Sequence, residues 1–313
     1  MILDNRTAAL ACAAFIACAS TSACGSRARQ PATATATDKV QVVASMSTLA
    51  ALVRTVAGGK ADVRSLVPVG GSVETYDPTP ADLVVLSRAR LLVENGAGLE
   101  LWLAKLVRAG GRADLRTLVL SDGLPVARSE DAGDFRRSAA GNPHLWLDPV
   151  YAQTYVKKIT DGLASVDPSN ADYYRSNERR QVRRLQALDV WARGQVDTIP
   201  SPDRVMICFH DAWYYFDRRY GIRDVGAVEP APGQEPSAGY FAELVAAARA
   251  NHVRAVFAEP QFSPKLADEL AASAGIRTVS DLYDDTVGAT QQLSTYEAMM
   301  RYDVRTIVSA LRP

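Results

Sequence analysis

Two of the three histidines in this 313-residue chain stand where a side chain could bind a ligand. His144 lies between a proline that disfavours helix and an Asp148-Pro149 pair, which is typical of a helix start. His210 directly follows the apolar run from Val205 to Phe209, which predicts a buried strand. At each position the imidazole could point at a ligand. The alternative for His144 is that its side chain is packed within the loop and binds nothing.

Two carboxylates occupy comparable places in the sequence. Glu74 follows the predicted strand that ends at Val67-Pro68, and Asp285 follows a predicted strand near Leu282. Ligands bind beyond the carboxyl ends of the strands in parallel α/β sheets. Two imidazoles and two carboxylates neutralise a divalent cation, and this set suits Zn²⁺ or Mn²⁺ better than a soft metal. We therefore predict a metal site built from Glu74, His144, His210 and Asp285, with two ligands from each half of the chain.

Four positions leave alternatives open. Glu74 could be a surface carboxylate, and Asp284 could bind in place of Asp285. Glu259 ends a predicted strand, so it is a candidate ligand or a cap for the following loop. Cys208 shares a strand face with His210, which makes it either a soft ligand or a core residue.

The remaining polar and aromatic residues near these segments receive structural roles. We expect His252 at the surface, Asp148 as a helix cap, and Asp211 as a group that supports a ligand through a hydrogen bond. We expect three tryptophans to pack rather than to form a carbohydrate platform: Trp102, Trp146 and Trp213.

Short apolar runs alternate with helix-length amphipathic stretches from residue 39 onward, which predicts an α/β fold with parallel sheets covered on both faces. Predicted strands are 40–44, 63–67, 91–94, 118–120, 205–209, 225–228, 253–258 and 278–282. Predicted helices, besides one that follows Pro149, are 47–56, 79–87, 99–109, 240–251, 264–274 and 294–311. We expect two lobes, each with a parallel sheet of about four strands flanked by helices.

One long helix is predicted to join the lobes. Asp167-Pro168 is a start signal, and the helical pattern continues to about Val196, a rod on the order of 42 Å. We expect an apolar stripe of Val182, Leu185, Leu188 or Ala192, and Trp191, with Arg179, Arg180, Arg183 and Arg184 facing water. The predicted domains are an N-terminal lobe at 39–166, a linker helix at 167–198 and a C-terminal lobe at 199–313.

The N-terminal segment is predicted to be an export signal. Arg6 precedes an apolar run that is too short to span a bilayer, and the run ends in a segment that resembles a bacterial lipoprotein cleavage site. We predict a signal peptide at 1–24, lipid attachment at Cys24 and a flexible tether at 25–38, with plain secretion as the alternative. In either case the protein is exported.

Composition excludes several classes of protein. The formal net charge is zero and the basic residues are scattered, so nothing indicates nucleic-acid binding. Cys208 is the one cysteine in the predicted folded part, which leaves no partner for an intrachain disulfide. No internal apolar run is long enough to cross a membrane. A hydrophobic content of 48% is ample for a core that supports the fold alone.

Five ordered segments resemble the metal-specific solute-binding lipoproteins of bacterial ABC importers, the zinc/manganese class with two lobes joined by a rigid helix. The segments are Val73–Pro80, Asn142–Pro149, Phe209–Phe216, Ala258–Phe262 and Asp285–Gly288. This resemblance implies that His144, His210 and Asp285 are the second, third and fourth ligands. Glu74 departs from the family's histidine at the first position, which leaves the choice among zinc, manganese and iron open. The His-rich loop of many zinc-specific members is also absent, since residues 122–141 contain no histidine.

The resemblance implies a binding protein rather than an enzyme. We expect a lipid-anchored monomer on the outer face of the cell membrane that captures a divalent metal and delivers it to an ABC permease. One alternative is a surface adhesin that keeps the fold without the metal. The other is an extracellular metallohydrolase with Asp211 or Glu259 as its base, which would need an open coordination position.

Overall fold

The computed structural model describes residues 39–127, 141–231 and 233–313, and residues 39–313 form one compact unit. The predicted signal peptide, Cys24 and the predicted tether lie outside the described residues. Within the described part, no helix combines the length and apolar character needed to cross a membrane.

The first half of this unit contains a four-stranded sheet in which every strand pair is parallel. Its strands are β1 (Val40–Ala44), β2 (Ala61–Ser65), β3 (Leu91–Glu94) and β4 (Arg116–Val119), in the order β2-β1-β3-β4. Val42 on β1 pairs with Val63 on β2 and with Leu91 on β3. These central strands are buried apolar runs because helices cover both faces of a parallel sheet.

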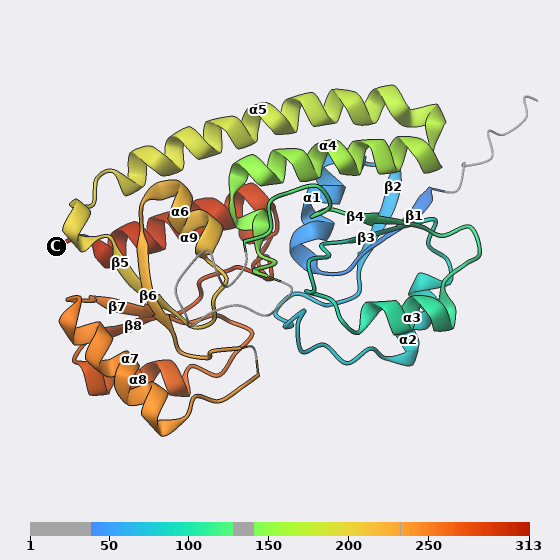
Figure 1. The fold of residues 1–313 in the computed structure, drawn as a ribbon. Helices are drawn as coiled ribbons and strands as arrows, with labels where there is room; N and C mark the ends of the chain where they lie inside the picture. Colours follow the sequence, from blue (N-terminus) through green and yellow to red (C-terminus); the bar gives the residue numbers. More distant parts are fainter. Residues whose placement is uncertain (1–38, 128–140, 232) are drawn as a thin grey trace, which may run out of the picture. The chain divides into compact units, whose positions relative to one another are not determined.

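Four helices accompany this sheet (Figure 1): α1 (Ser47–Ala57), α2 (Pro80–Leu86), α3 (Leu103–Gly110) and α4 (Pro149–Val166). The start of α2 is fixed by a capping box, in which Thr79 and Asp82 satisfy each other's backbone amides. At the start of α4, the Asp148 carboxylate accepts from the Val150 amide at 2.7 Å, which confirms the predicted cap.

The second half repeats the arrangement with an equivalent strand order. Its strands are β5 (Val205–Cys208), β6 (Arg223–Ala227), β7 (Ala255–Phe257) and β8 (Arg277–Val279), in the order β6-β5-β7-β8, again all parallel. Its helices are α6 (Tyr214–Tyr220), α7 (Ala238–Ala250), α8 (Lys265–Ala274) and α9 (Tyr296–Leu311). The predicted fold class, two parallel four-stranded sheets with flanking helices and one long helix, is confirmed.

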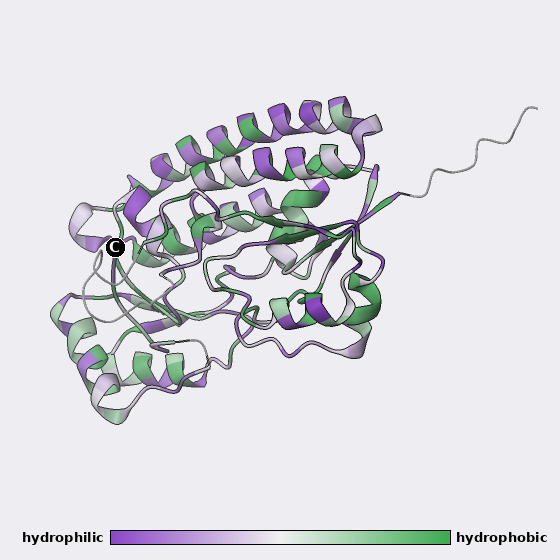
Figure 2. Cartoon of the chain, turned by 45° about the vertical axis from the view of Figure 1, so that its right-hand side comes forward, coloured by the Kyte–Doolittle hydropathy of each residue, from purple (hydrophilic) through white to green (hydrophobic). Residues whose placement is uncertain are grey.

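The long helix α5 (Ala171–Val196) runs beside α4 and also packs on α1, α6 and α9, so it contacts helices of both halves (Figure 1). Leu185, Leu188 and Ala192 are fully buried in a core cluster that draws on both halves, whereas all four arginines of the predicted solvent face are exposed. Figure 2 shows the resulting mixture of hydrophobic and hydrophilic residues along this helix. A short 3₁₀ turn (Pro168–Asn170) precedes α5, which therefore begins four residues after the predicted start.

Besides the start of α5, two predicted boundaries differ from the structure by three residues or more, and one helix was not predicted. Helix α3 begins at Leu103 rather than residue 99, because Ala97 and Gly98 both have positive φ and turns follow them. Strand β8 ends at Val279 rather than residue 282, and Asp281 then adopts a φ of 64° as the chain leaves the sheet. Helix α6 was not predicted, because its seven residues are too few to show a clear period.

Candidate metal centre

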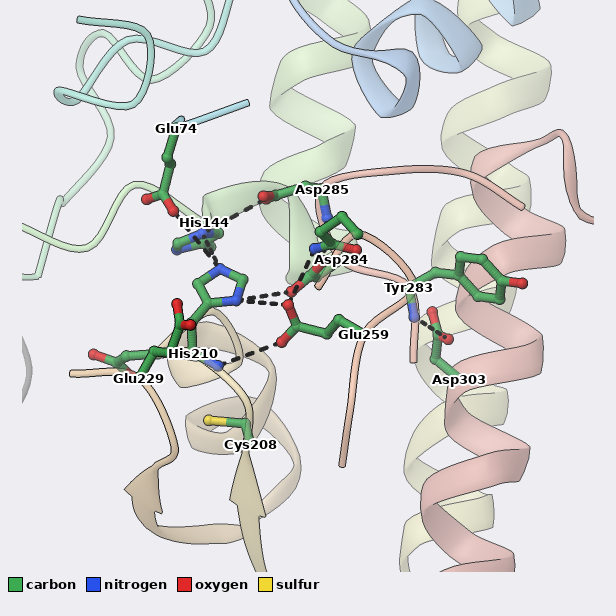
Figure 3. A network of polar contacts seen from close by, with 12 residues as sticks. Glu74, His144, Cys208, His210, Glu229, Glu259, Tyr283, Asp284, Asp285 and Asp303 are labelled. Carbon is green, nitrogen blue, oxygen red and sulfur yellow. Dashed lines mark hydrogen bonds and ion pairs between the residues drawn. The ribbon is translucent and has the colours of Figure 1, made fainter. Parts of the chain in front are cut away.

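Glu74, His144, His210 and Asp285 converge in space. Each offers one nitrogen or oxygen atom, and these four atoms all lie within 4.8 Å of one another (Figure 3). Both histidines and Asp285 are buried, and Glu74 is partly buried. The residues come from four separate loops, and each loop is held by its own hydrogen bonds.

His144 is positioned by a neutral amide. The side-chain oxygen of Asn142 accepts from the His144 backbone amide and lies 3.0 Å from the ring nitrogen Nδ1. Asn142 also donates to the Asp211 carbonyl, at 2.6 Å, and so joins the two halves of the molecule. Because Asn142 Oδ1 can only accept, the contact places the ring proton on Nδ1 and leaves Nε2 free to bind a ligand.

His210 is positioned by a carboxylate instead. Its Nδ1 lies 2.7 Å from Glu259 Oε2 and 3.5 Å from Asp284 Oδ2. Its Nε2 therefore points away from these acids and toward His144, where the two Nε2 atoms are 3.2 Å apart. Two imidazoles can meet at this distance when one Nε2 carries a proton and the other accepts it.

The pKa values of the two imidazole rings are shifted in opposite directions. Burial and the neighbouring His210 lower the pKa of His144 well below its usual value. Burial would also lower the pKa of His210, but Glu259 and Asp284 outweigh it and raise that pKa well above the usual value. Of the two rings, His210 is therefore the one that favours the shared proton, which lies between the two Nε2 atoms.

Asp285 supplies a carboxylate to the same point. Its Oδ1 lies 3.7 Å from His144 Nε2, whereas the neighbouring Asp284 turns to the opposite side of His210. The segment around Asp285 is tied to the first half: Thr286 accepts from the Gly70 amide at 2.8 Å, and its hydroxyl lies 3.0 Å from that of Ser47. The Asp284 carbonyl accepts from the Trp146 indole.

Glu74 completes the group from the loop between β2 and α2. Its Oε2 lies 4.0 Å from His210 Nε2. The Trp102 indole donates a hydrogen bond of 2.8 Å to the carbonyl of Val73, the residue before Glu74, and this bond holds the loop. Burial raises the pKa of Glu74 to about 7, with His210 opposing the shift. Of the two interpretations, a surface carboxylate does not describe this side chain, which is 18% exposed.

Three carboxylate oxygens in the group have no hydrogen-bond partner among the described residues: Glu74 Oε2, Asp285 Oδ1 and Asp285 Oδ2. Buried carboxylate oxygens are costly without a partner. Burial and the neighbouring Asp284 accordingly raise the pKa of Asp285 well above its usual range. A divalent cation among these oxygens and the two Nε2 atoms would satisfy all of them.

The other predicted residues fall outside the group. Cys208 points away from it in Figure 3, and its Sγ contacts Asp224 Oδ2 at 2.6 Å. His252 is exposed in the turn after α7, as expected. Asp211 supports the site through its backbone carbonyl, which accepts a hydrogen bond from Asn142. Trp146 and Trp213 are fully buried, which fits packing roles.

Sequence reasoning missed the two residues that hold the imidazoles in place. Asn142 was recognised as part of a motif but given no role of its own. Glu259 was expected to ligate or to cap the next loop, yet its closest contact is the ring of His210. A signal for Glu259 did exist, because a polar residue that ends a buried strand points to the same sheet edge as His210.

A family model described as the periplasmic zinc-uptake complex component A matches residues 42–310. The chain belongs to this family. The manganese-binding lipoprotein MntA of Halalkalibacterium halodurans is 30% identical over 288 residues, covering 92% of this chain and 93% of the relative. The metal ABC transporter substrate-binding lipoprotein SloC of Streptococcus mutans is 28% identical, covering 88% and 92%.

The fold is also shared with a solved structure. The manganese-bound periplasmic metal-binding protein of Candidatus Liberibacter asiaticus superposes with a TM-score of 0.77 at 23% identity, covering 87% of this chain and 99% of that one. Membership in the zinc-uptake component A family confirms the resemblance inferred from the five ordered segments.

Proposed function

We propose that this chain captures one divalent transition metal through Glu74, His144, His210 and Asp285 and delivers it to the membrane permease of an ABC importer. The observation that carries the proposal is the convergence of four donor groups, whose carboxylate oxygens Glu74 Oε2, Asp285 Oδ1 and Asp285 Oδ2 have no hydrogen-bond partner among the described residues. Two imidazole nitrogens meet two carboxylates whose combined charge balances a divalent ion.

The spacing of the donor atoms supports a four-coordinate ion. Ligands bound at about 2.1 Å in a tetrahedron lie roughly 3.4 Å from one another. The distances of 3.2 Å between the Nε2 atoms and 3.7 Å from His144 Nε2 to Asp285 Oδ1 are close to this value, and the 4.0 Å from His210 Nε2 to Glu74 Oε2 is somewhat longer. Four protein ligands leave no open position for a substrate or water, so binding and release, rather than catalysis, are the function of this centre.

The proposal includes export and attachment to the membrane. Relatives that match almost the full chain are named lipoproteins, and the sequence carries a lipoprotein-type cleavage site at Cys24. A lipid-anchored monomer on the outer side of the membrane could load metal there and dock on its permease. The relatives' names support both manganese and zinc as cargo, and Glu74 in place of histidine favours the harder ion.

The test combines metal analysis with titration. Protein purified without chelator should contain one equivalent of zinc, manganese or iron, and apoprotein should bind one equivalent in calorimetry. His210→Ala should abolish this stoichiometric binding, whereas His252→Ala, which changes an exposed histidine, should not alter it. Full stoichiometric binding by His210→Ala would refute the assignment.

A further inference from the structure

A second group of polar side chains, buried or partly buried, lies behind His210, on the side away from the other metal ligands. It comprises Glu259 from the end of β7, Gln261 two residues later, and Asp284 from the loop after β8. Glu259 is 3% exposed and Asp284 is fully buried. None of the three belongs to the group of four ligands, and we call them the acidic cradle.

The contacts of the cradle form one connected path. Glu259 Oε2 lies 2.7 Å from His210 Nδ1, and Glu259 Oε1 lies 3.5 Å from the His210 backbone amide. Gln261 Nε2 donates both to Glu259 Oε2, at 3.0 Å, and to Asp284 Oδ1, at 2.7 Å. Asp284 Oδ1 in turn accepts from the Asp285 amide at 2.6 Å. The path thus runs from one proposed ligand, His210, to another, Asp285 (Figure 3).

This arrangement fixes the ring in one orientation. A carboxylate on Nδ1 holds a proton there and directs the lone pair to Nε2, the atom that faces the other ligands. The ring also packs edge-on against Phe262, with centroids 5.6 Å apart, and Phe262 stacks on Phe209. His210 therefore cannot turn to present Nδ1 without losing the Glu259 contact.

We infer that Glu259, Gln261 and Asp284 are positioning residues that fix the His210 tautomer and hold His210 and Asp285 as one preformed pair. The inference rests on the proposed function, and none of the three contacts the metal itself. Gln261 is the element that joins the two carboxylates, because its one amide nitrogen bridges them. The cradle raises metal affinity by removing the need to order two ligands upon binding.

The experiment compares two substitutions at one position. Glu259→Ala removes the acceptor for Nδ1, and we expect metal affinity to fall about 10- to 100-fold, the usual effect of losing such a partner. Glu259→Gln keeps an oxygen that can accept from Nδ1–H, so it should recover most of that loss. Gln261→Ala should weaken affinity by less than Glu259→Ala. Glu269→Gln, an exposed glutamate on α8, is the matched control and should bind like the wild type.

A spectroscopic measurement separates positioning from general damage. In ¹⁵N-histidine spectra of the zinc-loaded wild type, His210 should be metal-bound at Nε2 and protonated at Nδ1. Glu259→Gln should keep this pattern, and Glu259→Ala should lose the downfield Nδ1 proton.

Three results would overturn the inference. The first is wild-type metal affinity in Glu259→Ala. The second is an equal loss of affinity in Glu259→Gln and Glu259→Ala, which would make Glu259 a ligand. The third is zinc bound at Nδ1 of His210. If Glu259→Ala does not fold, as judged by its melting transition, Glu259→Gln and Gln261→Ala still decide the question. A wild type that binds no metal at all would instead refute the proposed function.

Discussion

The two halves of the metal centre hold their histidines by opposite means. In the first half a neutral amide, Asn142, holds His144, and burial keeps that ring free of a second proton. In the second half the carboxylates Glu259 and Asp284 hold His210 and raise its pKa. The Nε2 atom of His144 can thus bind metal directly, whereas His210 must first release a proton. The choice of an amide or a carboxylate behind the ring makes this difference.

The largest expected effect is a strong pH dependence of metal binding. The pKa values of His210, Asp285 and Glu74 are all raised in the metal-free chain, to about 7 for Glu74, so these groups carry protons that the metal must displace. Affinity should therefore rise with pH, by about tenfold per pH unit for each proton displaced. Titration calorimetry at neutral pH, in buffers of different ionisation enthalpy, should count more than one proton released per metal bound. A constant affinity between pH 5.5 and pH 7.5 would contradict this picture.

Asn142→Asp sharpens the comparison, because it places a carboxylate behind His144 as well. The new charge should raise the pKa of His144, so that both rings hold protons in the metal-free chain. We expect a steeper pH dependence than in the wild type, and an affinity about tenfold lower at the acidic end. The measurement is the slope of log Kd against pH, with Asn251→Asp, in the turn after α7, as a control that adds the same charge outside the site. Equal slopes for Asn142→Asp and the wild type would show that the amide does not set the protonation of His144.

Glu74→His tests which half of the site chooses the metal. A third imidazole replaces a hard oxygen, so the ratio of the Zn²⁺ to the Mn²⁺ dissociation constant should shift toward zinc, by on the order of tenfold. The shift need not reverse the preference, because zinc outranks manganese at most sites with nitrogen and oxygen ligands. Both constants are measured for the wild type and the variant in one buffer. An unchanged ratio would place Glu74 outside the coordination sphere and leave three protein ligands.

The smallest expected effect concerns the link between the halves. Thr286→Val removes the hydroxyl that accepts from the Gly70 amide and contacts Ser47. We expect the free energy of unfolding of the metal-free protein to fall by about 1 kcal/mol. Thr290→Val, at an exposed threonine in the same segment, should change it by less. Chemical denaturation measures both variants, and equal stability would show that the Thr286 contacts contribute nothing.

The sheets and the four converging residues could be predicted from the sequence because both depend on local patterns. Buried apolar runs mark the strands, and polar residues just after them mark the ligand edge of a parallel sheet. Glu74 departs from the family pattern, yet its place after β2 was enough to include it. The position of Glu74 after the end of a strand thus indicated a ligand, although its residue type did not match the family's histidine.

The support behind the ligands could not be predicted in the same way. Whether Glu259 touches His210 depends on how far β7 and β5 advance before their loops turn, which is a matter of three-dimensional register. Asp284 and Asp285 are adjacent in sequence, but they face opposite sides of His210, in a segment where the chain bends. Helix α6 could not be predicted either, because its seven residues are too few to show a helical period.

The continuous helix α5 has a consequence for how the ion can leave. Its buried residues pack into a core cluster shared by both halves, so a wide hinge motion would have to bend the helix or break this packing. Glu74, in contrast, is carried by the loop between β2 and α2, where Thr75 lies close to Gly233. We therefore expect release to need a local rearrangement of this loop rather than a movement of the two halves relative to each other. The dwell time of the ion would be set by the stiffness of this loop, and a permease that grips the loop could shorten that time without moving the rest of the molecule.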